Sequence, residues 1–241
     1  MYGCLDWLVN EVNRLDVEVV LNHYVEADEV LKAGSDFVFV ATGGWPEPPE
    51  VSGGEFALSS WDVLSERSPL TGEILLFDEV GDHSGTVTAD VLADHSNLTM
   101  FTPDRVLLQD LGPTTSSVAL RHLSLKGVEF QCLAELDSIV KSGNRLLVTL
   151  RHVLTNELNT RTVDHVVVEH GLLPTDSLYH QLKPYSSNEG QLNQQALIDG
   201  HNPFKPVNSD GLFYLARLGD AVTGRNLHAA LLDALRMGSS I

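Results

Sequence analysis

The fold is decided by one stretch of the sequence, Asp36-Phe37-Val38-Phe39-Val40-Ala41-Thr42-Gly43-Gly44-Trp45-Pro46. Its run of apolar residues predicts a strand over residues 36–42 that is covered on both faces, as strands of a parallel sheet are. Gly43 and Gly44 then allow a turn with positive φ or a close approach of another backbone, and Pro46 stops the strand.

The chain repeats this phrase once. Residues 164–174 read Asp-His-Val-Val-Val-Glu-His-Gly-Leu-Leu-Pro and share the pattern D-x-V-x-V-x-x-G-x-x-P with residues 36–46. A valine–glutamate pair just after a predicted helix also recurs, at residues 17–19 and 128–130. Two copies with one spacing indicate an internal repeat of helix, short strand and long strand.

Composition limits the kinds of partner and environment. The 241 residues suffice for one large domain or two small interleaved ones, and 33 acidic against 15 basic residues give a formal charge of −18, which disfavours nucleic acid. Residues 1–6 lack the layout of a signal peptide and no apolar run approaches the roughly 20 residues that span a bilayer, so we expect a cytoplasmic protein without membrane contact. Two cysteines, Cys4 and Cys132, are too few for a four-cysteine cluster or zinc site.

Hydrophobic periodicity predicts most of the remaining elements. Helices are expected over residues 4–15 and 116–126, from Gly224 or Arg225 to Arg236, and briefly after Ser59-Ser60, with a helical turn over residues 26–32. Short strands are expected over residues 17–21, 128–130 and 212–218. Residues 136–153 predict a small antiparallel meander with a tight turn at Gly143.

Residues 73–102 predict a βαβ unit. A strand over residues 73–78 is followed by a polar glycine loop, a helix over residues 86–95 and a second strand over residues 98–102. Strand, glycine loop, helix and strand form the layout of a nucleotide-binding half-fold. The sequence therefore predicts an α/β fold with Rossmann-like parallel sheets and a small antiparallel meander.

The glycine loop of this unit is the first candidate site. Residues 78–85 read Asp-Glu-Val-Gly-Asp-His-Ser-Gly, which departs from G-x-G-x-x-G, and the acidic residues around the loop oppose a pyrophosphate. After the second strand, Asp104 could accept a ribose hydroxyl or Arg105 could bind a 2′-phosphate. Two interpretations stay open: a nucleotide loop, or a degenerate loop that no longer binds.

The end of the chain holds the second candidate. Gly219-Asp220 lies where a predicted strand meets a helix, a geometry that suits anions, and Asp220 could accept a ribose or ribityl hydroxyl or simply cap the helix. The ten histidines are scattered without metal-ligand spacing, and only His170 and His228 stand at positions of interest.

These motifs, in this order, resemble the two-dinucleotide-binding flavoproteins of the glutathione reductase type. Residues 74–85, 166–174 and 219–230 look most like the demethylase branch of the old-yellow-enzyme relatives, which include 2,4-dienoyl-CoA reductase, trimethylamine dehydrogenase and the N-methyl amino acid demethylases. The resemblance is to their C-terminal FAD/NAD(P)-binding region and covers nearly the whole chain.

The resemblance implies a domain division and a set of site residues. Residues 1–70 and 155–241 would form an incomplete FAD- or ADP-binding-like domain, and residues 71–154 an inserted NAD(P)-binding-like domain. The resemblance places no catalytic residue and no metal ligand in this chain. It implies cofactor-binding positions at Ala41, Thr42, Gly43, Gly44, Asp78, Gly81, Gly85, His170, Gly171, Gly219 and Asp220.

Family members also carry a (β/α)8 barrel with flavin mononucleotide and an iron–sulfur cluster, and a first βαβ unit with G-x-G-x-x-G; neither is found in this sequence. We therefore expect the nucleotide-binding portion of a flavin-dependent NAD(P)H oxidoreductase that passes reducing equivalents to a separate or missing barrel subunit. The alternative is a non-catalytic module for docking or homodimer formation, with weak or no nucleotide binding. The sequence indicates neither the substrate nor a choice between NADH and NADPH.

Overall fold

The computed structural model describes residues 2–65 and 69–241. The chain forms two compact units, each described by itself below. The first unit contains the chain up to Val40 together with Ser177–Ala216, and the second contains Ala41–Asp176 with Arg217–Ser239. The expected division into an FAD-like domain (residues 1–70 and 155–241) and an inserted NAD(P)-like domain (residues 71–154) concerns cofactor binding and stays a prediction.

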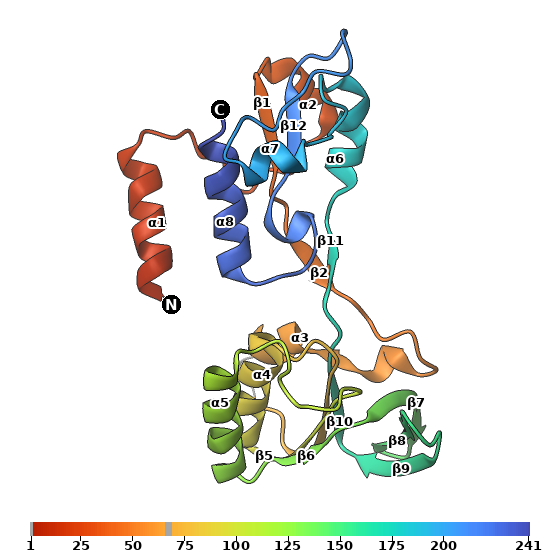
Figure 1. Ribbon diagram of the computed structural model, residues 1–241. Helices are drawn as coiled ribbons and strands as arrows, with labels where there is room; N and C mark the ends of the chain where they lie inside the picture. The colour runs from red at the N-terminus through yellow and green to blue at the C-terminus, as the bar shows by residue number, and fades with distance from the viewer. Residues whose placement is uncertain (1, 66–68) are drawn as a thin grey trace. The chain divides into compact units, whose positions relative to one another are not determined.

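The second unit is built on a five-stranded parallel sheet (Figure 1), which confirms the predicted fold class. The strand order is β3-β10-β4-β5-β6. The sequence neighbours β4 and β5 pair along most of their length, and β10 returns to pair with the other edge of β4. The strands span Leu58–Ser59 (β3), Gly72–Asp78 (β4), Ser96–Phe101 (β5), Glu129–Gln131 (β6) and His165–Glu169 (β10).

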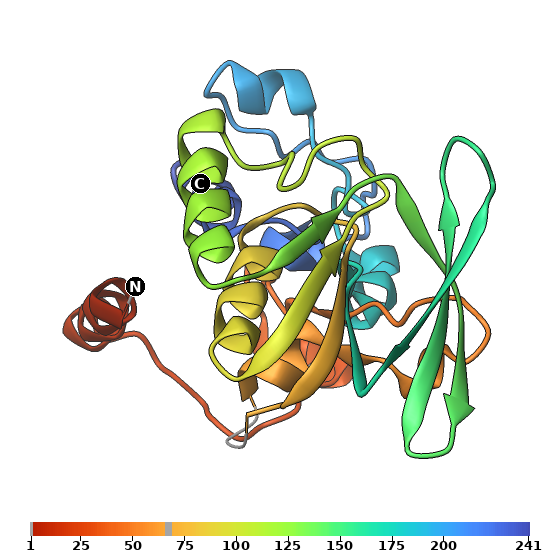
Figure 2. The same cartoon turned by 90° about the horizontal axis from the view of Figure 1, so that it is seen from below.

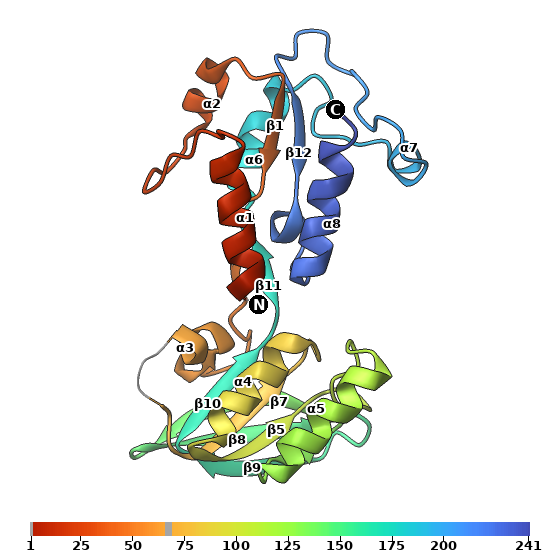
Figure 3. The ribbon, with the colours of Figure 1, turned by 90° about the vertical axis from the view of Figure 1, so that its left-hand side faces the viewer.

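Helices cover one face of this sheet. They are α3 (Ser60–Ser65), α4 (His83–Ala93) and α5 (Pro113–Leu125), which lie together on one side of the strands in Figure 3. Ile74 and Leu76 of β4 pack in the core on this side, with side chains from all three helices. The predicted βαβ unit is therefore confirmed, with α4 starting three residues earlier than expected.

The meander covers the opposite face (Figure 2). Leu75 and Phe77, which alternate with the helix-facing residues of β4, pack in a separate core with side chains of β7 (Ala134–Ser142), β8 (Arg145–His152) and β9 (Leu158–Val163). Strands buried on both faces read as continuous apolar runs, as β4 and β10 do. The predicted meander and its turn at Gly143 are confirmed.

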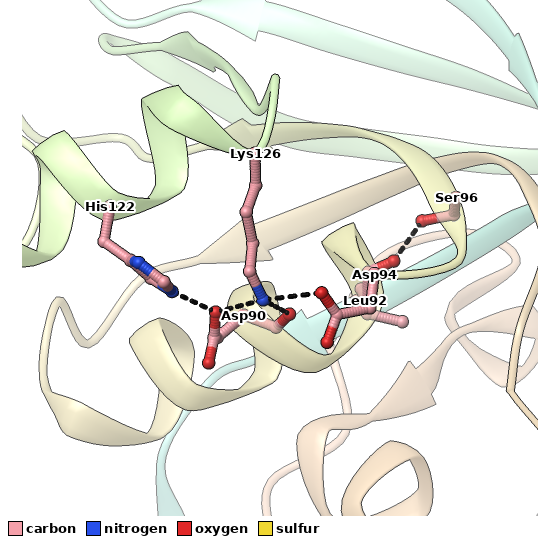
Figure 4. Close-up of polar contacts among 6 residues, drawn as sticks. All are labelled: Asp90, Leu92, Asp94, Ser96, His122 and Lys126. Carbon is pink, nitrogen blue, oxygen red and sulfur yellow. Dashed lines mark hydrogen bonds and ion pairs between the residues drawn. The ribbon is translucent and has the colours of Figure 1, made fainter.

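Helices α4 and α5 are also joined at the surface (Figure 4). Lys126, directly after α5, lies 2.6 Å from Asp90 and 2.7 Å from Asp94 of α4. His122 lies 2.7 Å from the same oxygen of Asp90. The Lys126 ammonium is the main cause that lowers the pKa of Asp90, and Asp90 in turn raises the pKa of Lys126.

The first unit has a smaller framework. Strands β1 (Phe37–Val40) and β12 (Tyr214–Arg217) form a two-stranded sheet. Only Val40 of β1 is buried, so the expected strand covered on both faces is wrong for this copy of the repeat. The unit also contains α2 (Ala27–Ala33), α6 (Ser177–Leu182), η2 (Lys183–Tyr185) and α7 (Gln194–Ile198).

The predicted strand over residues 17–21 is wrong as well. The predicted helix before it is present as α1 (Tyr2–Arg14), but no strand follows, and Val20 and Leu21 are 67% and 75% exposed. Residues 129–131, in the second copy, form β6 because β5 lies beside them and takes up their backbone hydrogen bonds. Among the described residues no strand offers the first copy such an edge.

The second unit also holds the elements near the candidate site. They are β2 (Gly44–Pro46), β11 (Leu172–Pro174), η1 (Gly54–Phe56), η3 (Gly219–Ala221) and α8 (Leu227–Gly238). Helix α8 starts later than predicted because the side chain of Asn226 caps it, accepting the Ala229 amide at 3.0 Å. No helix in the part of the chain that the structure describes is long and apolar enough to cross a membrane.

Candidate functional site

The predicted site residues of the second unit fall into two groups. One group lies at the carboxyl ends of the strands of the parallel sheet, and we call it the sheet-edge group: Asp78, Gly81, Gly85, His170 and Gly171. The other lies around the pair of short strands β2 and β11, and we call it the ribbon group: Ala41, Thr42, Gly43, Gly44, Gly219 and Asp220. His170 and Gly171 join β10 to β11 and so connect the two groups along the chain.

The sheet-edge group lies at the switch point of the parallel sheet. From β4 the chain moves through β5 to β6 on one side, whereas β10 adds on the other side of β4. Ligands of open α/β sheets bind outside the carboxyl ends of the strands at such a point. Here the last residues of the two strands, Asp78 and Glu169, are direct partners in the register.

Asp78 is the most deeply buried charged residue of this group, with 1% of its surface exposed. Its Oδ1 accepts the backbone amides of Gly81 at 2.9 Å and Val80 at 3.2 Å. Burial raises the pKa of Asp78 to about 7, and the nearby Glu169 carboxylate adds to the rise while the Gly81 amide opposes it. Asp78 therefore closes the loop after β4 on itself.

Glu169 is buried beside Asp78. It accepts the hydroxyl of Ser60 at the start of α3 and, at 3.3 Å, the amide of Gly171. Burial raises the pKa of Glu169, and these two hydrogen bonds oppose the rise. Its carboxylate thus ties β10 to α3 and to the turn that leads into β11.

The first turn of α4 is held by a second acid. Asp82 is the N-cap, and its Oδ1 accepts the Ser84 amide at 2.7 Å while its carbonyl oxygen accepts the Thr86 hydroxyl at 2.9 Å. Gly85 packs directly over Asp78, because a Cβ at this position would lie 2.5 Å from Asp78 Cγ. A glycine is therefore needed at position 85 because the Asp78 side chain occupies the space that a Cβ would fill.

His170 extends the polar network outward. Its Nδ1 pairs with the carboxylate of Glu79, the residue after Asp78. The Glu79 amide donates to the Glu169 carbonyl oxygen at 3.0 Å, so the turns after β4 and β10 are bonded to each other. The structure thus brings together all members of the sheet-edge group. It does not include Asp104, Arg105 or His228 in the contacts described for this group.

The ribbon group is organised by the repeated phrase. In each copy a strand runs into a glycine with positive φ, Gly43 at 72° and Gly171 at 91°, and then into a short strand. The two short strands pair antiparallel, with Trp45 opposite Leu173. Gly44 permits this pairing, because a Cβ there would lie 2.8 Å from the Leu173 carbonyl oxygen.

Open backbone remains at one end of the ribbon. Ala41 and Thr42 are exposed, and a Cβ built on Gly43 would meet nothing within 4 Å. The Gly43 carbonyl oxygen accepts the Thr175 amide at 2.9 Å, and the Thr42 hydroxyl donates to the Thr175 carbonyl oxygen. Residues 41–43 are therefore held by hydrogen bonds to Thr175 and remain accessible to solvent.

Gly219 and Asp220 form the turn η3 beside the ribbon. A Cβ on the nearby Gly224 would lie 3.0 Å from Leu172 Cβ of β11, so the loop from η3 to α8 packs on the strand that also binds Gly44. The carboxylate of the half-buried Asp220 accepts the Arg225 amide at 3.0 Å, which closes this loop. The structure therefore brings the two predicted motifs of the ribbon group to the same strand.

Two residues and one pocket of this region are not predicted as site features from the sequence. Glu169 enters the prediction only as part of the repeated phrase, although a carboxylate directly after three buried valines is a signal of a strand-end site. Ser60 enters the prediction only as part of the Ser59-Ser60 pair before a short helix. A pocket of about 350 Å³ beside the ends of β3 and β10, where Trp45 contributes to the wall together with Pro46 and Asp62, had no signal in the sequence.

The two expected cofactors fit these residues differently. At the ribbon, exposed backbone at Ala41–Gly43 and the Asp220 carboxylate offer groups that bind a ribityl or ribose hydroxyl, so one side of an FAD or ADP fits. At the sheet edge, the amides of Val80, Gly81 and Ser84 are already bonded to the carboxylates of Asp78 and Asp82. An NAD(P)H pyrophosphate does not fit there.

Comparison with known proteins agrees with the fold and with the resemblance. The chain is 35% identical over 239 residues to a probable N-methylproline demethylase of Rhizobium meliloti (strain 1021), which covers 98% of this chain and 35% of that protein. It is 32% identical over 240 residues to a multifunctional alkene reductase/demethylase OYE of Caballeronia cordobensis, covering 98% of this chain and 36% of the relative. The chain thus spans about a third of the length of these curated relatives.

Solved structures show the same fold at lower identity. A 2-naphthoyl-CoA reductase matches 96% of this chain and 31% of its own, with a TM-score of 0.71 and 20% identity. The thioredoxin reductase of T. acidophilum matches 83% of this chain and 62% of its own, with a TM-score of 0.58 and 15% identity. No family model matches the chain. The predicted resemblance to old-yellow-enzyme-like demethylases and the predicted fold class are both confirmed.

Proposed function

We propose that this chain is the nucleotide-binding portion of a flavin-dependent oxidoreductase, and that it holds one side of an FAD or ADP at the ribbon group. The observation that carries the proposal is that β11 pairs with Gly44 of β2 and also contacts η3, the turn that contains Gly219 and Asp220. Relatives named as a demethylase and as an alkene reductase/demethylase support an oxidoreductase role. A bound flavin would supply the redox chemistry.

The residues of this chain would bind and orient the nucleotide. The Ala41–Gly43 backbone offers carbonyl and amide groups without side-chain bulk at Gly43, and Asp220 offers a carboxylate oxygen for a hydroxyl. The sequence contains no G-x-G-x-x-G loop for the pyrophosphate, so tight binding requires residues from elsewhere. We propose that these residues belong to a barrel-containing part of the enzyme, which would complete the nucleotide site.

Thermal melting of the 241-residue chain tests this proposal. FAD or ADP at about 100 times its Kd is expected to stabilise the protein by about 2.7 kcal/mol. Asp220→Asn keeps an acceptor for the Arg225 amide but removes the charge, and it is expected to weaken ADP binding several-fold. The matched control is Asp210→Asn, at an exposed aspartate of the other unit, which should leave ADP binding unchanged.

A second candidate function is a non-catalytic module that docks or oligomerises with weak or no nucleotide binding. The apolar residues exposed between Leu5 and Val25 favour it, because such a surface is typical of an interaction site. Failure of FAD and ADP to stabilise a folded protein, together with a dimer or larger species in analytical ultracentrifugation, would support this function over the first.

A further inference from the structure

We infer that Asp78 occupies the place of a dinucleotide pyrophosphate, so that the switch point of the five-stranded sheet is closed to NAD(P)H. The inference concerns the sheet-edge group and is independent of the ribbon group proposed to hold FAD or ADP. It names Asp78 as a residue that determines which ligand the fold accepts.

The first step is the position of the loop. In a Rossmann unit the pyrophosphate lies on the turn between the first strand and its helix, where backbone amides point outward. In this sheet that turn is the loop from β4 to α4, since β5 and β6 follow on one side and β10 lies on the other. The loop therefore stands where the fold would bind a dinucleotide.

The second step is the use of its amides. Asp78 takes the amides of Val80 and Gly81, and the Asp82 side chain takes that of Ser84 at the start of α4. The Glu79 amide donates to the carbonyl oxygen of Glu169. The Thr86 amide donates to the carbonyl oxygen of Asp82. A phosphate would have to displace carboxylates that the chain itself supplies.

The third step is space. A loop glycine that admits a pyrophosphate leaves room beside its backbone, but Gly85 faces the Asp78 carboxylate, whose Cγ lies 2.5 Å from where a Cβ would stand. The glycine at this position is thus explained by the aspartate. The space beside the first turn of α4 is filled by a buried side chain.

The fourth step is charge. The carboxyl groups of Asp78, Glu79, Asp82 and Glu169 all belong to the loop or contact it, and the basic side chain described among their partners is the imidazole of His170, which pairs with Glu79. Like charges at short range oppose a doubly charged pyrophosphate. On this inference no hydride from NAD(P)H enters or leaves through this sheet.

The experiment titrates the full chain with NADPH, NADH and inorganic pyrophosphate, and reads binding at this loop by hydrogen exchange of residues 79–86. For the wild type we expect no added protection of these amides at about 1 mM ligand. Protection of the loop by NADPH or NADH would overturn the inference. An ADP-like contact at the ribbon would instead change exchange at residues 41–44 and 219–225, so the two proposals fail separately.

Two variants separate two effects of Asp78: its hydrogen bonds to the loop amides and its negative charge. Asp78→Ser frees the Val80 and Gly81 amides and is expected to bring pyrophosphate binding to the loop, with at least about a tenfold gain in affinity. Asp78→Asn removes the charge but keeps an oxygen for the same amides, and it should stay closed. A folded Asp78→Ser protein without this gain, or an Asp78→Asn protein that binds as well, would overturn the inference. If Asp78→Ser does not fold, Asp78→Asn and the wild-type exchange data decide.

Discussion

A buried carboxylate that is held by its own loop couples protonation to folding, and Asp78 is such a residue. Its pKa rises from 3.8 to about 7 in the folded protein, so the folded state binds the proton more tightly than the unfolded chain. Its contribution to stability is therefore complete below pH 3.8 and is lost as the pH rises through about 7. A shift of this size corresponds to roughly 4 kcal/mol.

Asp78→Asn should flatten this dependence, because the amide cannot ionise. Between about pH 4 and pH 8, we expect the variant to gain about 1–4 kcal/mol of unfolding free energy relative to the wild type. Urea unfolding followed by circular dichroism at a series of pH values measures the difference. The exposed Asp210→Asn serves as control, and parallel curves for wild type and Asp78→Asn would contradict the expectation.

Gly85 gives a second test at the scale of one residue. Gly85→Ala forces a methyl group against the Asp78 carboxylate and should destabilise the protein by about 2–4 kcal/mol. The loss should shrink by about 1–3 kcal/mol when the aspartate is also replaced, in Gly85→Ala/Asp78→Ala, because neighbouring residues couple. Urea unfolding of the four proteins in the cycle measures this coupling.

The matched control is Gly238→Ala near the end of α8, where a Cβ would meet nothing within 4 Å. It should change the unfolding free energy by no more than about 1 kcal/mol. Additive effects of Gly85→Ala and Asp78→Ala would show that the two residues do not touch.

The sequence identified Asp78 and Gly85 as special but not how they relate. An acidic residue after a buried strand and a glycine at a helix start are signals of a ligand loop, and both were expected to face a nucleotide. The contact between them depends on the first turn of α4, which starts at His83 because Asp82 caps it. Because α4 starts three residues earlier than predicted, Gly85 lies inside its first turn and faces Asp78.

At the scale of elements, the repeated phrase predicted its own local structure well. The strand, the positive-φ glycine and the short strand recur at Gly43 and Gly171 because φ preferences act within a few residues. The antiparallel pairing of β2 with β11 could not be predicted, since it joins segments more than a hundred residues apart and leaves no mark in either segment alone.

The same contrast explains the missing strand over residues 17–21. Val17-Glu18-Val19 and Val128-Glu129-Phe130 have similar β propensity, but only the second copy has a neighbouring strand, β5. A strand needs a partner for its amides and carbonyls, so propensity alone does not create one.

Limited proteolysis with a glutamate-specific protease tests this difference between the copies. Cleavage is expected first after Glu18, in a segment without regular structure, and far more slowly after Glu129, whose backbone pairs with Thr99. Mass spectrometry of fragments over time measures the order, with cleavage after Glu18 at least about ten times faster. Equal rates at the two glutamates would show that residues 17–21 are protected by structure.

At the scale of the whole molecule, the sequence predicted the elements of the larger unit, namely the parallel sheet, the βαβ unit and the meander, and little of the smaller unit. Successive side chains of β4 point to opposite faces of the parallel sheet, and they are apolar on both. Both faces must therefore be covered by other elements. In the smaller unit, β1 and β12 form a two-stranded sheet, and the polar loops of the unit fold around side-chain contacts. Asn188, for example, bonds both the amide and the carbonyl oxygen of Leu215. Such contacts have no periodicity to predict them.

Net charge is the property that belongs to the molecule as a whole. With 33 acidic and 15 basic residues, the folded chain carries a formal charge of −18, and bringing these charges together opposes folding. Added salt screens this repulsion, with a Debye length of about 10 Å at 0.1 M. Salt also weakens half-buried ion pairs at the surface such as Lys126–Asp90, and this effect lowers stability.

The repulsion arises from all the excess acidic residues, whereas each ion pair involves only two or three side chains. We therefore expect the screening of repulsion to outweigh the weakening of ion pairs. Raising sodium chloride from about 0.01 M to about 0.3 M should therefore raise Tm by a few degrees. Lys126→Met removes a cation and its pairs with Asp90 and Asp94, so its Tm should start lower and rise more steeply with salt. Potassium chloride at the same ionic strength controls for specific ion binding. A Tm that falls with salt would instead mean that the local pairs outweigh the net charge.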